Sequence, residues 1–217
     1  MREEKVLELQ DVSYWYNKSA KILDKVQASF VSGKLYAIVG RSGSGKTTLL
    51  SLMGGLDRTM EGQILFKGKS IDDIGYEKYR RECVSFVFQN YNLIDYMTSL
   101  ENVMLTSKSS PLEFLKDVGI TEEEAKRNVL KLSGGQQQRV AIARAVASET
   151  PIILADEPTG NLDEKTSDEI VDLLRKQVRD KSKTVIIVTH SKEIALAADF
   201  VYKIENGSLV CADMTRT

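Results

Sequence analysis

Apolar and polar positions along the chain follow two patterns, and together these patterns predict an α/β fold. Continuous apolar runs are typical of strands buried on both faces of a mostly parallel sheet. Four such runs cover residues 35–39, 83–88, 151–155 and 184–189. Alternating stretches at 6–16 and 22–30 predict an N-terminal antiparallel hairpin, and a terminal hairpin is expected around Asn206-Gly207.

Within a segment of about residues 90–135 the apolar period becomes helical. Leu115 and Val118 fall on one helix face, and Thr121 with Glu124 forms a capping box for the next helix. This segment carries no catalytic residue types before its last residues. We therefore expect a small helical insert within the α/β chain, and such an insert suggests a contact surface.

A glycine-rich motif follows the first apolar run. Residues 40–47, GRSGSGKT, match G-x-x-x-x-G-K-[ST] in full, between a predicted strand and a helix that begins at residue 47. The glycines let backbone N–H groups turn toward phosphate oxygens, and the helix start adds partial positive charge. Lys46 is expected to reach the outer phosphates of a nucleotide and Thr47 to bind the accompanying Mg²⁺. The completeness of the motif disfavours the alternative of a turn that binds nothing.

Chemistry-bearing side chains end the other apolar runs. Asp156 and Glu157 are adjacent, so their side chains alternate in direction. Asp156 is placed to hold Mg²⁺, and Glu157 to orient or deprotonate an attacking water, as phosphoryl transfer requires. A solvated carboxylate beside a helix cap is the alternative. His190, the only histidine, ends a run at the edge where ligands bind in open α/β sheets, and Gln89 either reaches a metal or water or closes a turn.

A second glycine-rich helix start lies at residues 132–136, LSGGQ, ahead of an amphipathic helix predicted over 137–147. This helix start is also suited to an anion. A single nucleotide rarely needs two such helix starts from one subunit. The second one therefore raises the question of which phosphate it would bind.

Three aromatic residues, Tyr14, Trp15 and Tyr16, end the first strand of the N-terminal hairpin. Any of their rings could stack on a nucleobase, because every base has a π face. Packing of all three in the core is the alternative. The sequence pattern leaves the choice open.

Composition limits the function classes. A chain of 217 residues can form one well-buried domain, and its 42% hydrophobic and 28% charged residues are ordinary for a globular protein. The formal net charge of -1 lacks the positive excess that is typical of nucleic-acid-binding proteins. No apolar run approaches the roughly 20 residues of a membrane span. We expect a soluble, intracellular protein. Cys83 and Cys211 lack metal-ligand spacing and are expected to be reduced packing residues.

With these motifs in place, the chain resembles the ATP-binding subunit of ABC (ATP-binding cassette) transporters over nearly its whole length. The resemblance rests on LSGGQ followed by QQRVAIARA, then ILADEP, then a histidine after VIIVT, in the order of that family. Segments 54–57 (GGLD), 100–103 (LENV) and 158–163 (PTGNLD) resemble the lipoprotein-release and macrolide-exporter subgroup. The segment between Gln89 and Ser133 departs from that subgroup, because it is shorter than usual.

The resemblance implies a role for each site residue. Tyr16 takes the place of the ring that stacks on adenine, and Gln89 that of the glutamine that senses Mg²⁺ and passes motion to a membrane partner. The implied catalytic set is Glu157, His190 and Lys46. The implied metal set is Thr47, Gln89 and Asp156. The implied ATP-binding set is Tyr16, Gly40, Arg41, Ser42, Gly43, Ser44, Gly45, Lys46, Thr47 and Thr48.

The resemblance also implies pairing with a second, identical or different cassette. Two cassettes pack head to tail and enclose two ATP molecules between the phosphate loop of one and the LSGGQ segment of the other. The residues implied to bind ATP in trans are Ser133, Gly134, Gly135 and Gln136. A loop crossing the dimer interface is implied at Asn161, Leu162 and Asp163.

The implied function is ATP binding and hydrolysis that energises a separate membrane permease, for export or mechanotransmission. Residues 1–217 are then a single ABC ATPase domain, held at the cytoplasmic face of the cell membrane by the permease. Two alternatives stay open. One is a regulatory cassette that signals through a membrane partner without transport, and the other is a soluble cassette ATPase, although no nucleic-acid partner is expected.

Overall fold

The centre of the fold is a six-stranded sheet, seen in a computed structural model that describes residues 4–16, 20–160 and 162–212. Its strand order is β10-β9-β3-β8-β7-β6, and all pairs are parallel except β9 with β10. The strands are β3 (Leu35–Val39), β6 (Val84–Val87), β7 (Ile152–Asp156), β8 (Thr184–Thr189), β9 (Phe200–Glu205) and β10 (Ser208–Cys211). The four apolar runs of the sequence are thus the four adjacent strands β3, β8, β7 and β6, as predicted.

A second, antiparallel sheet has the order β2-β1-β4-β5. Its strands are β1 (Lys5–Tyr14), β2 (Leu23–Val31), β4 (Glu61–Phe66) and β5 (Lys69–Ser70). The pairing of β1 with β2 confirms the predicted N-terminal hairpin. The β9–β10 pair likewise confirms the terminal hairpin, whose turn residues Asn206 and Gly207 both have positive φ.

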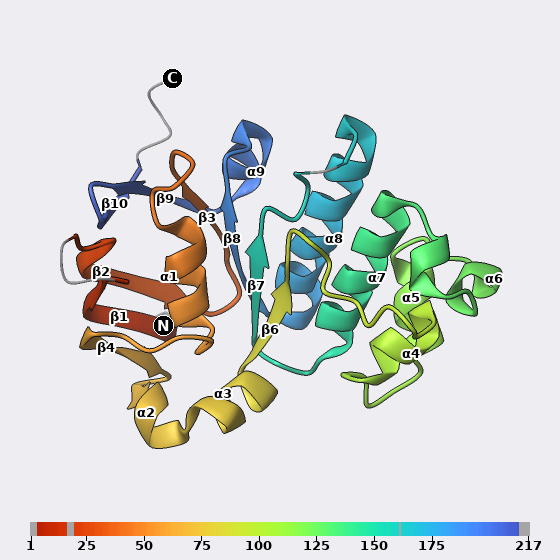
Figure 1. Cartoon of the computed structure of the whole chain (residues 1–217), viewed down its shortest axis with the longest axis horizontal. Helices are drawn as coiled ribbons and strands as arrows, with labels where there is room; N and C mark the ends of the chain where they lie inside the picture. The colour runs from red at the N-terminus through yellow and green to blue at the C-terminus, as the bar shows by residue number, and fades with distance from the viewer. Residues whose placement is uncertain (1–3, 17–19, 161, 213–217) are drawn as a thin grey trace.

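The six-stranded sheet separates two apolar cores. On β3, Leu35 and Ala37 face one core while Tyr36 and Ile38 face the other. Helix α1 (Lys46–Met53) packs between the two sheets, and α8 (Glu164–Lys181) and α9 (Lys192–Ala197) cover the opposite face (Figure 1). Gly54 ends α1 where only a glycine fits, because a Cβ there would lie 2.1 Å from Cζ of Phe86.

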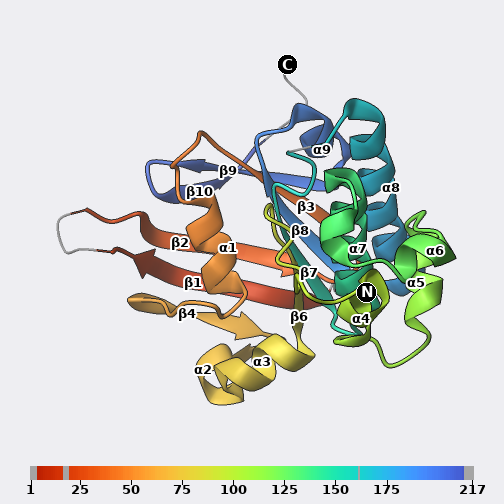
Figure 2. The same cartoon turned by 45° about the vertical axis from the view of Figure 1, so that its right-hand side comes forward.

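The predicted helical insert lies beside the β6 edge of the sheet (Figures 1 and 2). Its elements are α4 (Ser99–Met104), α5 (Pro111–Asp117), α6 (Glu122–Ala125), the 3-10 turn η1 (Val129–Lys131) and α7 (Gly134–Ala147). Helices α2 (Ile71–Ile74) and α3 (Tyr76–Glu82) connect the antiparallel sheet to β6. The predicted capping box of Thr121 with Glu124 is present at the start of α6.

Two expectations are corrected. Helix α7 begins at Gly134 and not at Gln137, because Ser133 caps it through a capping box with Gln136 and draws both glycines into the first turn. Cys83 is buried as expected, but the expectation that Cys211 packs in the core is wrong: Cys211 is exposed, since β10 is the outermost strand and pairs only with β9. Within the described ranges, no helix combines the length and apolarity needed to cross a membrane.

Candidate nucleotide-binding site

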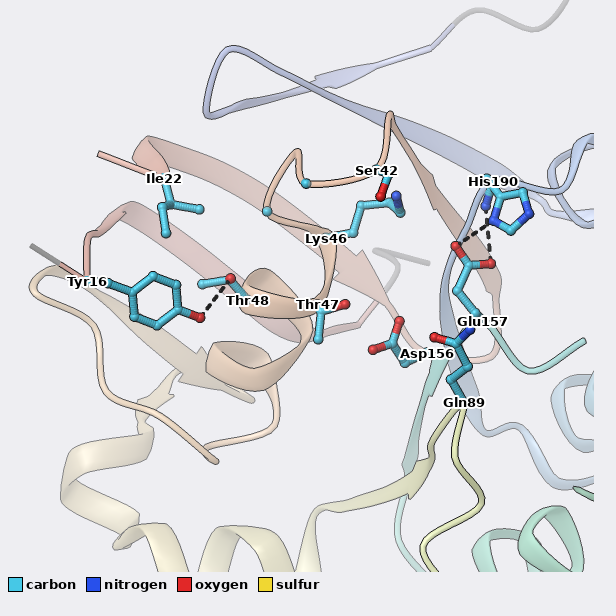
Figure 3. A pocket seen from close by; sticks show the side chains of 12 residues that line it. Tyr16, Ile22, Ser42, Lys46, Thr47, Thr48, Gln89, Asp156, Glu157 and His190 are labelled. Carbon is cyan, nitrogen blue, oxygen red and sulfur yellow. Dashed lines mark hydrogen bonds and ion pairs between the residues drawn. The ribbon is translucent and has the colours of Figure 1, made fainter. Parts of the chain in front are cut away.

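A cleft of about 630 Å³ opens at the carboxyl ends of the central strands, where the phosphate loop turns into α1 (Figure 3). Its walls come from segments far apart in the sequence. The residues that line it are Tyr16, Ile22, Ser42, Gly43, Gly45, Lys46, Thr47, Thr48, Gln89, Asp156, Glu157 and His190. All but Ile22 are residues that the sequence predicted for an ATP site.

The phosphate loop is shaped by two glycines in left-handed backbone conformations. Gly43 has φ 75° and Gly45 has φ 97°, values that side-chain-bearing residues adopt only with strain. A Cβ on Gly45 would also lie 2.9 Å from Cγ2 of Ile22. The loop folds around Lys46, whose Nζ donates hydrogen bonds to the carbonyl oxygens of Gly40 (2.9 Å) and Arg41 (3.1 Å). The ammonium is therefore held at the loop, where phosphate groups would bind.

Asp156 lies at the end of β7, facing the first turn of α1. Asp156 is only 8% exposed, and burial raises the pKa of its carboxyl group. A hydrogen bond with Thr47 and the charge of Lys46 oppose this shift without cancelling it, while nearby Glu157 adds to it. A buried carboxylate beside a hydroxyl is a set of hard oxygen donors, which is the ligand type that Mg²⁺ prefers.

Glu157 has a strained backbone and a well-held side chain. Its φ of 43° is uncommon for a residue with a side chain, and its backbone N–H donates to the carbonyl of Val188 at 2.9 Å. Oε2 accepts hydrogen bonds from the Thr189 hydroxyl (2.9 Å) and from the backbone N–H of His190 (3.3 Å), and Oε1 lies 2.9 Å from Nδ1 of His190. The strained conformation thus aims this carboxylate at the histidine in the cleft.

The structure separates the three aromatic residues. Tyr14 is buried and its hydroxyl donates to Asp57; this hydrogen bond, with burial, raises the pKa of Tyr14 to about 12. Trp15 lies beneath the ammonium of Lys21, 5.7 Å from the ring centroid. Tyr16 is 71% exposed at the cleft, edge-on to Tyr14 with ring centroids 5.2 Å apart. Of the three rings, Tyr16 is the one that lines the cleft and is open to a base.

Some predicted residues lie outside this cleft. Arg41 and Ser44 line an adjacent cavity of about 800 Å³ on the other side of the loop, together with Ser42 and Gly43. Gly40 lines neither cavity and contributes its carbonyl to Lys46.

The predicted trans-acting residues, 133–136, form the start of α7 and do not line the cleft of their own chain. We call residues 133–136 the signature turn. Leu162 packs beside it, since a Cβ on Gly135 would lie 3.7 Å from Cδ2 of Leu162. Asp163 caps α8 by accepting from the backbone N–H of Thr166, and Asn161 lies outside the described residues.

The sequence pattern missed Ile22 and Thr189. Ile22 directly precedes β2 and contributes an apolar wall to the cleft near Tyr16 (Figure 3). Thr189 is the last residue of β8 and holds Glu157. An apolar residue and a threonine carry no motif, so only their position beside recognised residues, the threonine directly before His190, could have drawn attention to them.

The fold and the cleft define a phosphate-loop nucleotide-binding protein of the cassette type. The family model described as ABC transporter matches residues 23–160, so the chain belongs to the ABC transporter family. The ATP-binding protein YclH of Bacillus subtilis is 49% identical over 214 residues, covering 94% of this chain and 95% of that protein. LolD of Rickettsia felis, a lipoprotein-releasing system ATP-binding protein, is 39% identical, with 94% and 97% covered.

Solved structures agree with this assignment. The dimeric structure of MJ0796, a bacterial ABC transporter cassette, has a TM-score of 0.86 and 37% identity, covering 94% of this chain and 96% of that one. A dimeric post-hydrolysis state of MJ0796 bound to ADP and Pi has a TM-score of 0.87 and 36% identity, with 97% and 100% covered. The chain is an ATP-binding domain of the ABC transporter family and an ATPase.

Proposed function

We propose that this chain binds and hydrolyses ATP to power a separate membrane permease, for export or mechanical work across the membrane. The observation that carries the proposal is the convergence of Lys46, Asp156, Glu157 and His190 on one cleft, since phosphoryl transfer needs an ammonium, carboxylates and hydrogen-bonding groups around the phosphates. The residue roles follow from their contacts.

The triphosphate binds along the phosphate loop, and the adenine stacks on Tyr16. Backbone N–H groups of the loop and the ammonium of Lys46 stabilise phosphate charge, which requires Lys46 to exchange its bonds with Gly40 and Arg41 for bonds to phosphate oxygens. Thr48 lines the same wall and its hydroxyl lies 3.3 Å from that of Tyr16. This hydrogen bond links the base end of the cleft to the phosphate end.

Thr47, Asp156 and Gln89 would hold Mg²⁺. The fit rests on chemistry of this chain: a carboxylate, a hydroxyl and an amide oxygen line one wall of the cleft, and within the part of the chain that the structure describes the Lys46 ammonium bonds to loop carbonyls. Bound there, the metal supplies positive charge to the phosphates. The raised pKa of Asp156 is consistent with a carboxylate that needs a cation.

Glu157 acts as the base that receives a proton from the attacking water. Thr189 and His190 hold its carboxylate, so the acceptor is oriented before the substrate arrives. His190 has a largely exposed side chain, 72%, and can reach a terminal phosphate by turning away from Glu157. That movement would free Oε1 of Glu157 to accept the proton from water.

The active unit is a pair of cassettes enclosing two ATP molecules. The signature turn is a helix N-terminus suited to an anion, and it lies outside the cleft of its own chain. The phosphate that it binds would therefore belong to an ATP held in the cleft of a second chain. Leu162 lies beside the signature turn and Asp163 follows it in sequence, so the loop implied to cross such an interface starts next to this turn. The dimeric MJ0796 cassettes support pairing of this kind.

The permease would dock between the sheet edge and the helical insert, at the cytoplasmic face of the membrane. A groove of about 500 Å³ lies there, with Phe86 and Phe88 on one side and the exposed Leu105 on the other. Phe88 directly precedes Gln89, so a segment seated in the groove would touch the stretch after β6 that carries this cleft residue. The relative MacB of Shigella sonnei, 37% identical over 94% of this chain, is named an ATP-binding/permease protein, and this chain covers 34% of it.

Glu157→Gln tests the proposal. The variant should bind ATP, form a stable dimer and lose turnover by at least about 100-fold, because the amide cannot accept the proton. The control is Glu113→Gln, an exposed carboxylate on α5 that should leave hydrolysis unchanged. Unchanged hydrolysis in Glu157→Gln contradicts the assigned base.

The partner is tested with tagged Glu157→Gln protein and ATP, purified from solubilised native membranes. Recovery of an integral membrane protein supports the permease role, and transport by the reconstituted pair separates a transporter from a regulatory cassette. Recovery of ribosomes, DNA or other soluble partners alone would overturn the transporter role and leave the ATPase chemistry standing.

A further inference from the structure

The side chain of Gln136 in the signature turn is fully engaged within its own chain. Its Oε1 accepts a hydrogen bond from the backbone N–H of Ser133 at 2.9 Å, and its Nε2 donates to Oε1 of Glu124 at 2.6 Å. The second oxygen of Glu124 accepts from the backbone N–H and the hydroxyl of Thr121, each at 2.8 Å. One carboxylate therefore joins the first turn of α6 to the first turn of α7.

The donors and acceptors fix this arrangement. The Thr121 hydrogen bonds hold the pKa of Glu124 below its usual value, so its carboxylate is ionised at neutral pH and can only accept. The backbone N–H of Ser133 can only donate. The amide of Gln136 must therefore point its nitrogen at Glu124 and its oxygen at Ser133, and both side chains are half-buried, which strengthens the contact.

We propose that Glu124 is a positioning residue for the signature turn and that it acts through the side chain of Gln136. The turn is held against α6, and the hydroxyl of Ser133 keeps its proton free, because its oxygen accepts from the Gln136 backbone N–H at 3.3 Å. Ser133 can then donate to a phosphate of the partner cassette. The inference rests on the proposed function, since the signature turn acts on ATP only when two cassettes pair.

This assignment changes the expected task of Gln136. The resemblance implied that it binds ATP in trans, whereas its amide here holds the turn in shape. It also gives the helical insert a direct hydrogen-bonded route to the signature turn, because α6 belongs to the insert. A shift of α6 would move the groups that contact the partner's nucleotide.

Glu124→Gln separates the two roles of Glu124, which are the capping box with Thr121 and the hydrogen bond from Gln136. A glutamine can keep the capping box, because its oxygen still accepts from Thr121. Its amide nitrogen would then face Nε2 of Gln136, and two donors cannot bond. Glu101→Gln is the matched control: Glu101 forms the same capping box with Thr98, at 2.8 and 2.9 Å, and none of its hydrogen bonds among the described residues reaches the signature turn.

The measurement is the ATP concentration that gives half-maximal dimer, by light scattering, in full-length protein carrying Glu157→Gln. Glu124→Gln should raise it about tenfold, the size expected for one charged hydrogen bond, and Glu101→Gln should change it less than about twofold. With Glu157 restored, Glu124→Gln should raise KM for ATP while kcat at saturating ATP stays within about twofold. A merely structural role would lower kcat together with the folded fraction.

Exchange of the two side chains provides the rescue. In the double variant Glu124→Gln with Gln136→Glu, the new glutamine can donate to the new glutamate, whose other oxygen accepts from Ser133. Recovery toward the parent ATP concentration supports the inference. Gln136→Glu alone carries the same added charge, so a double variant that needs at least as much ATP as Gln136→Glu alone overturns the inference.

The result also distinguishes this inference from the proposed function. If the Glu157→Gln parent does not pair in ATP, the proposed function fails and this inference fails with it. If the parent pairs and Glu124→Gln pairs at the same ATP concentration, only the role of Glu124 is overturned.

Discussion

Asp156→Asn is expected to stabilise the nucleotide-free protein while removing its response to Mg·ATP. Asp156 is 8% exposed, and burial raises the pKa of its carboxyl, so the charged form is less favourable in the folded chain than in the unfolded chain. The charge of Lys46 offsets this only in part, and its ammonium is hydrogen-bonded to loop carbonyls. Asparagine has the same shape, carries no charge and can still accept a hydrogen bond from Thr47.

The gain in the free energy of unfolding should be about 1 kcal/mol, the usual size for one stabilising substitution, here the removal of a buried negative charge. In a chain of this length it raises the melting temperature by roughly 2–4 °C. In the wild type, Mg·ATP at about 100 times its Kd adds about 2.7 kcal/mol, or roughly 5–10 °C. Since the variant would lack a proposed ligand of Mg²⁺, it should lose most of that second increase, and the order of the two melting temperatures should reverse when Mg·ATP is added.

The sign of the pH dependence checks the cause. A carboxyl whose pKa is raised on folding lowers stability as the pH rises through its titration range. The advantage of Asp156→Asn should therefore be present at neutral pH and should vanish in acid, where Asp156 is protonated in both the folded and unfolded states. Asp172→Asn, an exposed position on α8, is the control and should show neither effect. A nucleotide-free variant that melts at or below the wild type, or one that keeps the full Mg·ATP increase, would refute the reasoning.

Three further outcomes follow from the structure. Tyr16→Ala should weaken ATP binding by about 1–3 kcal/mol, measured by titration calorimetry, whereas Tyr16→Phe should keep most of the stacking. Burial lowers the pKa of Lys183 to about 8, so wild-type stability should rise between about pH 8 and 10.5 relative to Lys183→Met; parallel denaturation curves across that range would argue against a buried ammonium. A thiol reagent should react fast with exposed Cys211, while buried Cys83, whose pKa burial raises, should react only on unfolding; two fast thiols would contradict this packing.

The sequence by itself determined the strands, the phosphate loop and most of the cleft. Each of these depends on short-range patterns: an apolar run makes a buried strand, and the glycines of the loop set its backbone wherever it occurs. Because parallel strands end at the same edge of a sheet, residues that follow such runs meet there. Asp156, Glu157 and His190 could therefore be placed in one site before any contact was known.

Only the tertiary structure decided between side chains that look equivalent in the sequence. Tyr14 and Tyr16 are both tyrosines at the end of one strand, and Asp57, distant in sequence, takes the hydroxyl of Tyr14 and leaves Tyr16 at the cleft. Cys211 is exposed because its strand is the outermost one, a fact set by strand order.

The tertiary structure also decided the hydrogen-bond partners of the Gln136 side chain. Glu124 is 12 positions away, and a capping glutamate in the sequence gives no sign that its Oε1, which takes no part in the capping box, reaches another helix. Local pattern fixes the conformation of the backbone, whereas the partner of a polar side chain depends on which segments the packing of the cores brings together.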